Sequence, residues 1–270
     1  MISHSVQPTS PTLILVFGPF DPSGSSCLPA DAITVAALGG HALSTVTALH
    51  VQDTAGIEDI QTIGSEIIDD QARCLLEDMP VQAIKVGALY TAESVSVLAQ
   101  IAADYSHVPL VLHLGALPDQ DVLQDDEAED VLAAVFELLL PQTDIVLAEH
   151  NLLAHWQTDG LLPSAGTLPA AQTLLQCGAQ WVLTTGSPLR PGHSAYLLQG
   201  PDQQTLNWAW QAPAIRLADP DGPLACALTL QLAQGVPVPQ AVEQAILQSA
   251  AMATRNFQPG MGLRLINRSA

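Results

Sequence analysis

Short runs of consecutive apolar residues alternate along this chain with longer stretches in which apolar residues recur every three or four positions. The runs predict buried strands, and the periodic stretches predict helices that pack one face against them. We expect strands over residues 13–17, 44–51, 57–63, 83–86, 110–114, 145–147, 181–184, 195–198 and 206–211. We expect helices over residues 28–38, 65–78, 91–103, 131–140, 168–176, 224–233 and 240–253, and an irregular tail over 257–270.

The alternation of strands and helices predicts one α/β domain with a mostly parallel sheet and helices on both of its faces. We assign this domain to residues 13–270 and expect residues 1–12, which are mainly polar, to form a disordered N-terminal leader. Sheets of this class carry their sites at the carboxyl ends of the strands. The candidate functional residues are therefore those that directly follow each predicted strand.

The composition excludes several classes of function. The chain has 27 acidic residues against 7 basic ones, a formal net charge of −20. We expect no nucleic acid and no membrane as a partner, because both are bound through basic patches. No apolar run reaches the roughly 18 residues of a membrane-spanning helix. The four cysteines are widely spaced, so we predict no metal site. We expect a cytoplasmic protein, since the first residues do not resemble a signal peptide.

The turn of Asp219, Pro220, Asp221 and Gly222 precedes an apolar helix and has two interpretations. Unpaired N–H groups at a helix N-terminus, together with the helix dipole, form an anion site, where a kinase would bind the transferred phosphate. Here two carboxylates stand at that entrance, and proline supplies no N–H donor. The other interpretation is an ordinary capped helix start, where Asp and Pro are favoured.

Five segments, in order, resemble the hydroxymethylpyrimidine and hydroxymethylpyrimidine phosphate kinases of the ribokinase superfamily. They are residues 21–31 (DPSGSSCLPAD), 45–54 (TVTALHVQDT), 85–89 (KVGAL), 232–235 (LAQG) and 258–262 (QPGMG). The resemblance implies a ribokinase-like fold and a homodimer. It also implies ATP- and Mg²⁺-dependent phosphoryl transfer to an aminopyrimidine, at its hydroxymethyl group or its monophosphate, in thiamine biosynthesis. Such transfer relies on positioning and charge neutralisation.

The resemblance also assigns site residues. For a pyrimidine pocket these are Asp21, Gly24, Asp31 and Gln52, and for the nucleotide side they are Thr185, Gly186 and Gly222. The carboxamide of Gln52 both donates and accepts, which suits the edge of an aminopyrimidine. The alternative is that Gln52 is a turn residue, that Asp31 is an acid on a helix surface and that Asp21 only organises its turn.

The phosphate-side positions depart from the family pattern. The family's GxGC turn falls on residues 219–222, so Gly222 stands where the family has a reactive cysteine. The other departures are His113 and Leu114 in place of Asp-Pro, Glu149 and Leu152 at the NxxE positions, and residues 184–188 in place of a double glycine and histidine. Each carboxylate about 4 Å from a phosphate oxygen costs about 1–4 kcal/mol, depending on the local dielectric.

These departures predict a family member with reduced or lost phosphoryl transfer that retains a pyrimidine pocket and acts in binding or regulation. ATP and Mg²⁺, which the resemblance implies, then become doubtful. The first alternative is an active ATP-dependent hydroxymethylpyrimidine or phosphomethylpyrimidine kinase, with Asp221 in a catalytic base role beside Gly222. The second alternative is a kinase of a sugar or pyridoxal type.

Overall fold

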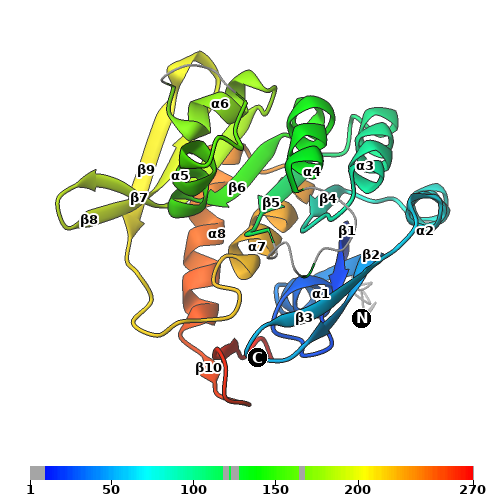
Figure 1. Ribbon diagram of the computed structural model, residues 1–270, viewed down its shortest axis with the longest axis horizontal. Helices are drawn as coiled ribbons and strands as arrows, with labels where there is room; N and C mark the ends of the chain where they lie inside the picture. The colour runs from blue at the N-terminus through cyan, green and yellow to red at the C-terminus, as the bar shows by residue number, and fades with distance from the viewer. Residues whose placement is uncertain (1–9, 118–121, 123–127, 164–167, 270) are drawn as a thin grey trace, which may run out of the picture.

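The computed structural model describes residues 10–117, 122, 128–163 and 168–269 (Figure 1). Its strands are β1 Thr12–Phe20, β2 Gly40–Gln52, β3 Ile57–Thr62, β4 Ala83–Val86, β5 Leu110–Leu114, β6 Ile145–Glu149, β7 Trp181–Arg190, β8 His193–Gln199, β9 Thr205–Trp210, β10 Asn256–Phe257 and β11 Leu265–Ile266. Its α-helices are α1 Cys27–Ala37, α2 Ser65–Asp78, α3 Ala92–Asp104, α4 Ala128–Ala134, α5 His150–Thr158, α6 Ala170–Gln176, α7 Gly222–Ala233 and α8 Val238–Ala253. Short π and 3₁₀ turns are η1 Val135–Leu139, η2 Leu140–Gln142 and η3 Pro201–Gln203.

The nine-stranded sheet has the order β3-β2-β1-β4-β5-β6-β7-β8-β9. Neighbouring strands in the series β2, β1, β4, β5, β6 and β7 pair in parallel. Strand β3 pairs antiparallel with β2, and β8 and β9 form an antiparallel extension of β7. The prediction of a mostly parallel sheet is confirmed. The parallel strands end on one edge, which brings the loops after β1, β4, β6 and β7 together.

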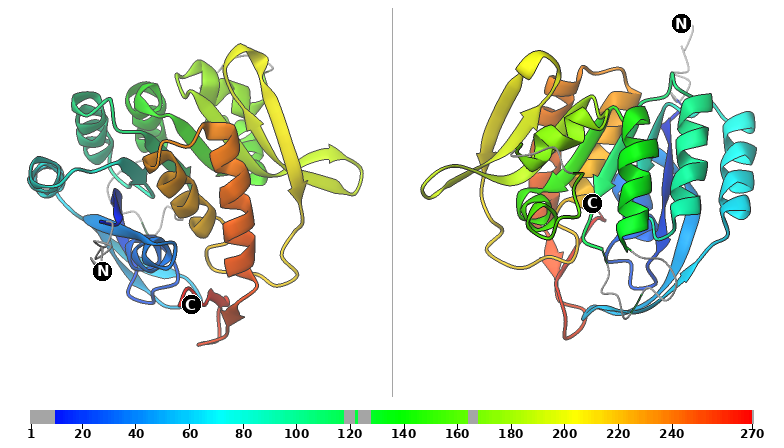
Figure 2. Two further views of the ribbon diagram at one scale, coloured as in Figure 1. Left: turned by 180° about the vertical axis from the view of Figure 1, so that it is seen from behind. Right: turned by 45° about the horizontal axis from the view of Figure 1, so that its top comes forward.

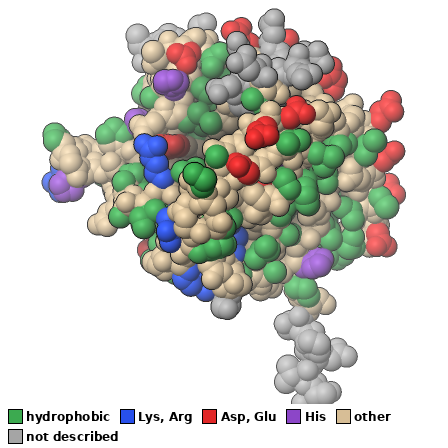
Figure 3. Space-filling model, turned by 60° about the horizontal axis from the view of Figure 1, so that its bottom comes forward, with side chains coloured by type: hydrophobic (Ala, Val, Ile, Leu, Met, Phe, Trp, Pro, Cys, Tyr) green, Lys and Arg blue, Asp and Glu red, His purple; other side chains and the backbone are tan. Residues whose placement is uncertain are grey.

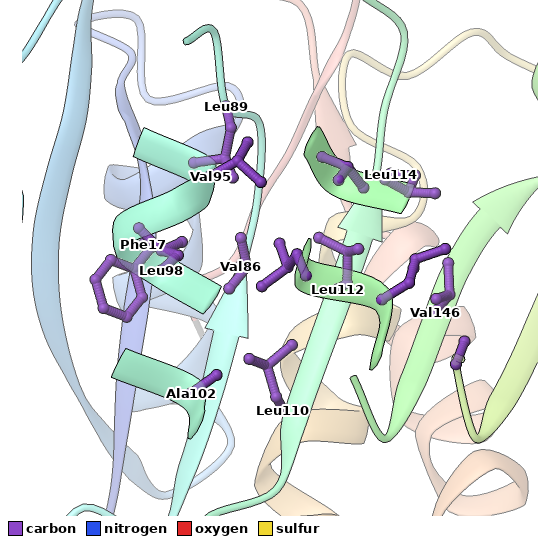
Figure 4. Close-up of a cluster of buried hydrophobic side chains, with 14 of the residues drawn as sticks. Phe17, Val86, Leu89, Val95, Leu98, Ala102, Leu110, Leu112, Leu114 and Val146 are labelled. Atoms are coloured by element: carbon purple, nitrogen blue, oxygen red, sulfur yellow. The ribbon is translucent and has the colours of Figure 1, made fainter. Parts of the chain in front are cut away.

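Helices cover both faces of the sheet (Figure 2). Helices α2 to α6 lie on one face over the largest core cluster, in which Phe17, Val86 and Leu112 pack against Leu98 and Val95 of α3 (Figure 4). The other face carries α1, α7 and α8. Helix α7 lies against the sheet between α1 and α8 (Figure 2), and its residues from Gly222 to Leu232 are all buried. This position explains why its sequence has no polar face.

Several boundaries differ from the sequence prediction. Helix α5 was not expected, because its buried apolar residues are only Leu153 and Trp156 and it begins directly after β6 without a side-chain cap. The helix expected over 131–140 is α4, continued by the turns η1 and η2. The tail is not wholly irregular, since β10 pairs with β11. The disordered leader was expected over 1–12, but Thr12 already begins β1, and residues 1–9 lie outside the described residues.

The described residues contain no helix that is both long enough and apolar enough to cross a membrane.

Gly178, directly after α6, should be intolerant of a side chain. Its φ is +111°, and an added Cβ would lie 2.8 Å from Pro141 Cα. We expect Gly178→Ala to lower the free energy of unfolding by about 2–4 kcal/mol, from left-handed backbone strain and overpacking. Gly160→Ala is the matched control, because Gly160 has φ +77° after α5 with open space around its Cβ, and should cost about 1 kcal/mol. Urea unfolding measures both, and equal losses would contradict the packing argument.

Candidate active site

Asp21 organises the loop between β1 and α1. One carboxylate oxygen accepts from Ser23 N and Oγ at 2.8 and 2.6 Å, and the other accepts from the N–H and hydroxyl groups of Ser25 and Ser26 at 2.7–3.0 Å. Burial raises the pKa of Asp21, whereas the hydrogen bonds from these serines lower it. Together the hydrogen bonds have the larger effect, so the pKa lies below its usual value. Gly24 makes the tight turn with φ +67°. The carboxylate thus shapes the loop and is itself fully buried.

Asp31 of α1 lies inside the molecule, in contact with two other elements. Its Oδ2 accepts from Lys85 Nζ of β4 at 2.7 Å, and its Oδ1 accepts from Cys226 Sγ of α7 at 3.1 Å. Lys85 and Asp31 are only 2% and 3% exposed. Burial lowers the pKa of Lys85, but the charge and the hydrogen bond of Asp31, together with the nearby Cys226 and Asp219, raise it more, so the ammonium stays protonated. Asp31 is therefore not a helix-surface acid, and the interaction joins α1, β4 and α7.

Gln52 ends β2 beside the loop that Asp21 organises. Its Oε1 lies 2.9 Å from His50 Nδ1, and its Nε2 donates to Ser25 Oγ at 3.4 Å. The side chain is half-buried. The structure thus brings Gln52 next to the 21–26 loop, as the proposed pyrimidine pocket requires, while Asp31 points away to Lys85.

The entrance of α7 carries a carboxylate in the position expected for an anion. Asp219 Oδ1 accepts from Gly222 N at 2.9 Å, and Asp219 Oδ2 accepts from Arg268 Nη2 at 3.0 Å. Burial raises the pKa of Asp219, and the charge of Arg268 opposes that rise. A Cβ on Gly222 would overlap the Asp219 carboxylate. A cysteine at position 222 and Asp219 in this conformation therefore exclude each other.

Asp221 stands beside this pair in a different environment. Its Oδ2 accepts from Thr185 Oγ1 of β7 at 2.8 Å. Burial raises its pKa to about 6; the Thr185 hydrogen bond opposes this rise, whereas the nearby Asp219 and Glu149 add to it. The next residue of β7, Gly186, has φ +73° and lies against the Trp210 ring. Thr185 and Gly186 lie in the middle of β7, where its parallel pairing with β6 ends, and Thr185 there contacts Asp221 at the start of α7.

The other positions that depart from the family pattern have varied surroundings. Burial, together with the charge of Lys85, lowers the pKa of His113 to about 3, so this imidazole is neutral. Leu152 packs against the large apolar core, and Glu149 is exposed. In the described residues no group of three or more His, Cys, Asp or Glu side chains is arranged to hold a metal ion.

Basic side chains are concentrated near the C-terminal tail. Four of the seven basic residues, Arg216, Arg255, Arg264 and Arg268, follow residue 215. Figure 3 shows one face of the molecule, on which Lys and Arg side chains gather on the left and acidic side chains lie mainly at the top and right. Arg268 is buried, and it also donates to Thr34 Oγ1 and to the Ser25 carbonyl. The tail thus connects the 21–26 loop to the entrance of α7.

Sequence reasoning missed the partners that hold these residues. Two of these residues, Arg268 and Cys226, were not identified as parts of the site because their partners are distant in the sequence. His50 was not identified because it lies within a predicted strand. One signal was available for Lys85. It is the only lysine of the chain and lies in an otherwise apolar strand, where a charge requires a buried partner.

Sequence comparisons show which known proteins this chain is similar to. The family model described as phosphomethylpyrimidine kinase matches residues 21–267. A hydroxymethylpyrimidine/phosphomethylpyrimidine kinase of Streptomyces coelicolor is 28% identical over 259 residues, which cover 95% of this chain and 94% of that protein. A thiamine biosynthesis multifunctional protein, ThiED, of Corynebacterium glutamicum is 32% identical over 127 residues, which cover 47% of this chain and 16% of that protein.

A solved structure extends the likeness to the whole fold. Pyridoxal kinase of Bacillus subtilis, solved as an ADP complex, matches with a TM-score of 0.80 and 18% identity, over 97% of this chain and 98% of that one. At this identity the likeness concerns the fold alone, which is that of the ribokinase-like kinases.

The buried ion pair yields a stability prediction. Asp31→Asn leaves the Lys85 ammonium without its counter-charge, so we expect the free energy of unfolding to fall by about 3–5 kcal/mol. Adding Lys85→Met removes the unpaired charge and should recover at least half of the loss. Asp69→Asn is the control, because its partner Arg73 is partly exposed on α2, and it should cost about 1 kcal/mol or less. Denaturant unfolding tests this; no recovery in the double variant would contradict it.

Proposed function

Because this chain belongs to the phosphomethylpyrimidine kinase family, we propose that it is an ATP-dependent kinase of a hydroxymethyl-bearing aminopyrimidine or of its monophosphate. The family is linked to thiamine biosynthesis, and we place the reaction there. One observation about the chemistry of the site supports this proposal most directly. The Asp221 carboxylate is held by Thr185 at the entrance of α7 with a pKa of about 6.

Asp221 has the properties that a general base for a hydroxyl nucleophile requires. A base works best when its pKa lies near the operating pH, and burial brings this carboxyl there from its usual value. Thr185 donates to one oxygen only, so the other carboxylate oxygen can accept the proton of a hydroxymethyl group. In this arrangement Asp221 takes the role of the base although Gly222 occupies the position of the family's cysteine.

The substrate side of the proposal rests on the loop after β1 and the end of β2. Ser25 and Gln52 offer a hydroxyl and a carboxamide next to each other, and Asp21 holds the serine loop in place. An aminopyrimidine presents an amino donor next to a ring-nitrogen acceptor, and a carboxamide can satisfy both groups at once. We therefore place the pyrimidine ring at Gln52.

The nucleotide side suits a magnesium complex better than a free nucleotide. Asp219 and Glu149 raise the pKa of Asp221, which shows that negative charge accumulates at this edge. Mg²⁺ is bound through one or two carboxylates together with substrate phosphates, and Glu149, which lies near Asp221 at this edge, is the residue that would hold it. Mg²⁺-bound ATP supplies the phosphoryl group for transfer. The Gly222 N–H would face the developing charge once Asp219 releases it.

A second candidate function, pyrimidine binding without phosphoryl transfer, is favoured by one observation. Asp219 occupies the Gly222 N–H, and Arg268 holds it there, so a phosphate must displace a carboxylate to reach this donor. The related proteins give no indication that transfer has been lost, and we therefore place this function second.

The first prediction concerns the base. Asp221→Asn should lower kcat for pyrimidine phosphorylation by about 10²–10⁴-fold while leaving the Kd of the pyrimidine within a factor of about three. Wild-type kcat should rise with pH through a value near 6, because only the ionised carboxylate accepts a proton. Asp159→Asn, an exposed acid after α5, is the control. Full activity in Asp221→Asn would disprove the base role, and no transfer by the wild type would leave the binding function.

The second prediction concerns the negative charge at the entrance of α7. Asp219→Asn keeps an oxygen that can accept from Gly222 N but removes the charge, so Mg·ATP should bind about 5–100-fold more tightly. Calorimetric titration measures this affinity. Glu66→Gln, on the exposed start of α2, should leave it unchanged. Equal affinities in Asp219→Asn and the wild type would show that the nucleotide phosphates do not approach this carboxylate.

A further inference from the structure

A chain of buried polar side chains runs behind Gln52. His50 and Gln52 are two residues apart on β2 and so face the same side of the strand. His50 Nδ1 lies 2.9 Å from Gln52 Oε1, and His50 Nε2 lies 3.0 Å from the hydroxyl of Tyr90, in the segment after β4. His50 and Tyr90 are both buried, and their ring centroids are 5.6 Å apart. The chain continues on the other side through Ser25 to Asp21.

With the amide oxygen of Gln52 toward His50, the donors and acceptors of this chain run in one direction. Gln52 Oε1 is an acceptor, so His50 Nδ1 must carry a hydrogen. In the neutral ring His50 Nε2 is then an acceptor, and the Tyr90 hydroxyl donates to it. Burial lowers the pKa of His50, which agrees with a neutral ring. At the other end, Gln52 Nε2 donates to Ser25 Oγ, and the Ser25 hydroxyl donates to Asp21 Oδ2 at 2.7 Å.

The hydrogen bonds leave Gln52 with a defined capacity for a ligand. Its oxygen has one lone pair beyond the bond to His50, and its nitrogen has one hydrogen beyond the bond to Ser25. A glutamine without such neighbours can rotate its amide and serve a ligand edge of either polarity. Here rotation would place an N–H against the His50 N–H and the amide oxygen toward Ser25, so both bonds would be lost or rearranged.

We propose that His50 and Tyr90 are positioning residues that fix the amide of Gln52 in one orientation. This site then selects a ligand edge with an acceptor nitrogen next to an amino donor and rejects the edge of opposite polarity. The inference rests on the proposed function, because it assumes that Gln52 meets the pyrimidine. A purely structural role for His50 would fill the space between β2 and Tyr90 without affecting this choice.

Two pyrimidines test the selection directly. 4-Amino-5-hydroxymethylpyrimidine offers an acceptor N3 beside an amino donor, whereas its 4-oxo counterpart offers an N3–H donor beside a carbonyl acceptor. Calorimetric titration without ATP should give a Kd for the amino compound at least about 100-fold lower than for the oxo compound, since the wrong edge leaves buried polar groups unpaired. His50→Phe should reduce this ratio about tenfold or more, and Tyr90→Phe should reduce it less.

Control variants separate positioning from packing. His41→Phe changes an exposed histidine at the start of β2, and Tyr105→Phe removes the hydroxyl of a tyrosine at the end of α3. Both should keep the wild-type ratio. If the wild type selects the amino compound and both His50→Phe and Tyr90→Phe keep the full ratio, the positioning role is overturned while the proposed function stands. If the wild type binds neither pyrimidine, the proposed function and this inference both fall.

Nitrogen NMR of the wild-type protein provides a test that needs no variant to fold. The His50 ring should be in the Nδ1–H tautomer near neutral pH, with Nε2 unprotonated. An Nε2–H tautomer in the wild type would mean that Gln52 presents its amide in the opposite orientation, and it would overturn the proposal.

Discussion

The buried contact between Lys85 and Asp31 is the interaction on which the arrangement of the site depends. Removing an ammonium from water costs several kcal/mol, and only a close counter-charge with further hydrogen bonds offsets that cost. Asp31 fulfils this role and also accepts from Cys226. These hydrogen bonds join helix α1, strand β4 and the buried helix α7. Arg268 also links the loop before α1 to the entrance of α7, through the Ser25 carbonyl and Asp219, and these two segments carry the two halves of the candidate site.

The local pattern of the sequence was sufficient for most elements and insufficient for the contacts among them. Helix α2 and the strands β4 and β5 have the predicted bounds, because their apolar periodicity or continuity is unbroken. Helix α5 was missed, since two buried apolar residues do not establish a period. Asp31 lies 54 positions from Lys85 and 195 from Cys226. Periodicity carries no information over such separations, so the resemblance could place Asp31 near the site but not identify its partners.

The two aspartates at the entrance of α7 show how the environment separates residues that look equivalent in the sequence. Both appeared there as charges that repel a phosphate. In the structure Asp219 is balanced by Arg268 and bound to the helix N-terminus. Among the described residues, the hydroxyl of Thr185 is the one hydrogen-bond partner of the Asp221 carboxylate, whose pKa is raised. One carboxylate therefore competes with an anion for the helix, and the other is suited to accept a proton. Asp221 as the base stays a prediction, and the surroundings that suit it to this role, Thr185 and Glu149, are visible only in the structure.

Both halves of the site are already hydrogen-bonded within the protein. Ser25 and His50 engage the amide of Gln52, and Asp219 engages Gly222. A ligand at either place must therefore use the remaining donor and acceptor positions or replace an internal bond, and replacing a bond yields only the difference between two similar interactions. Such a site gains little affinity from each contact but penalises a wrong partner strongly, because a mismatched group leaves buried atoms unpaired. Selectivity between ligands, more than tight binding, is what this arrangement of residues provides.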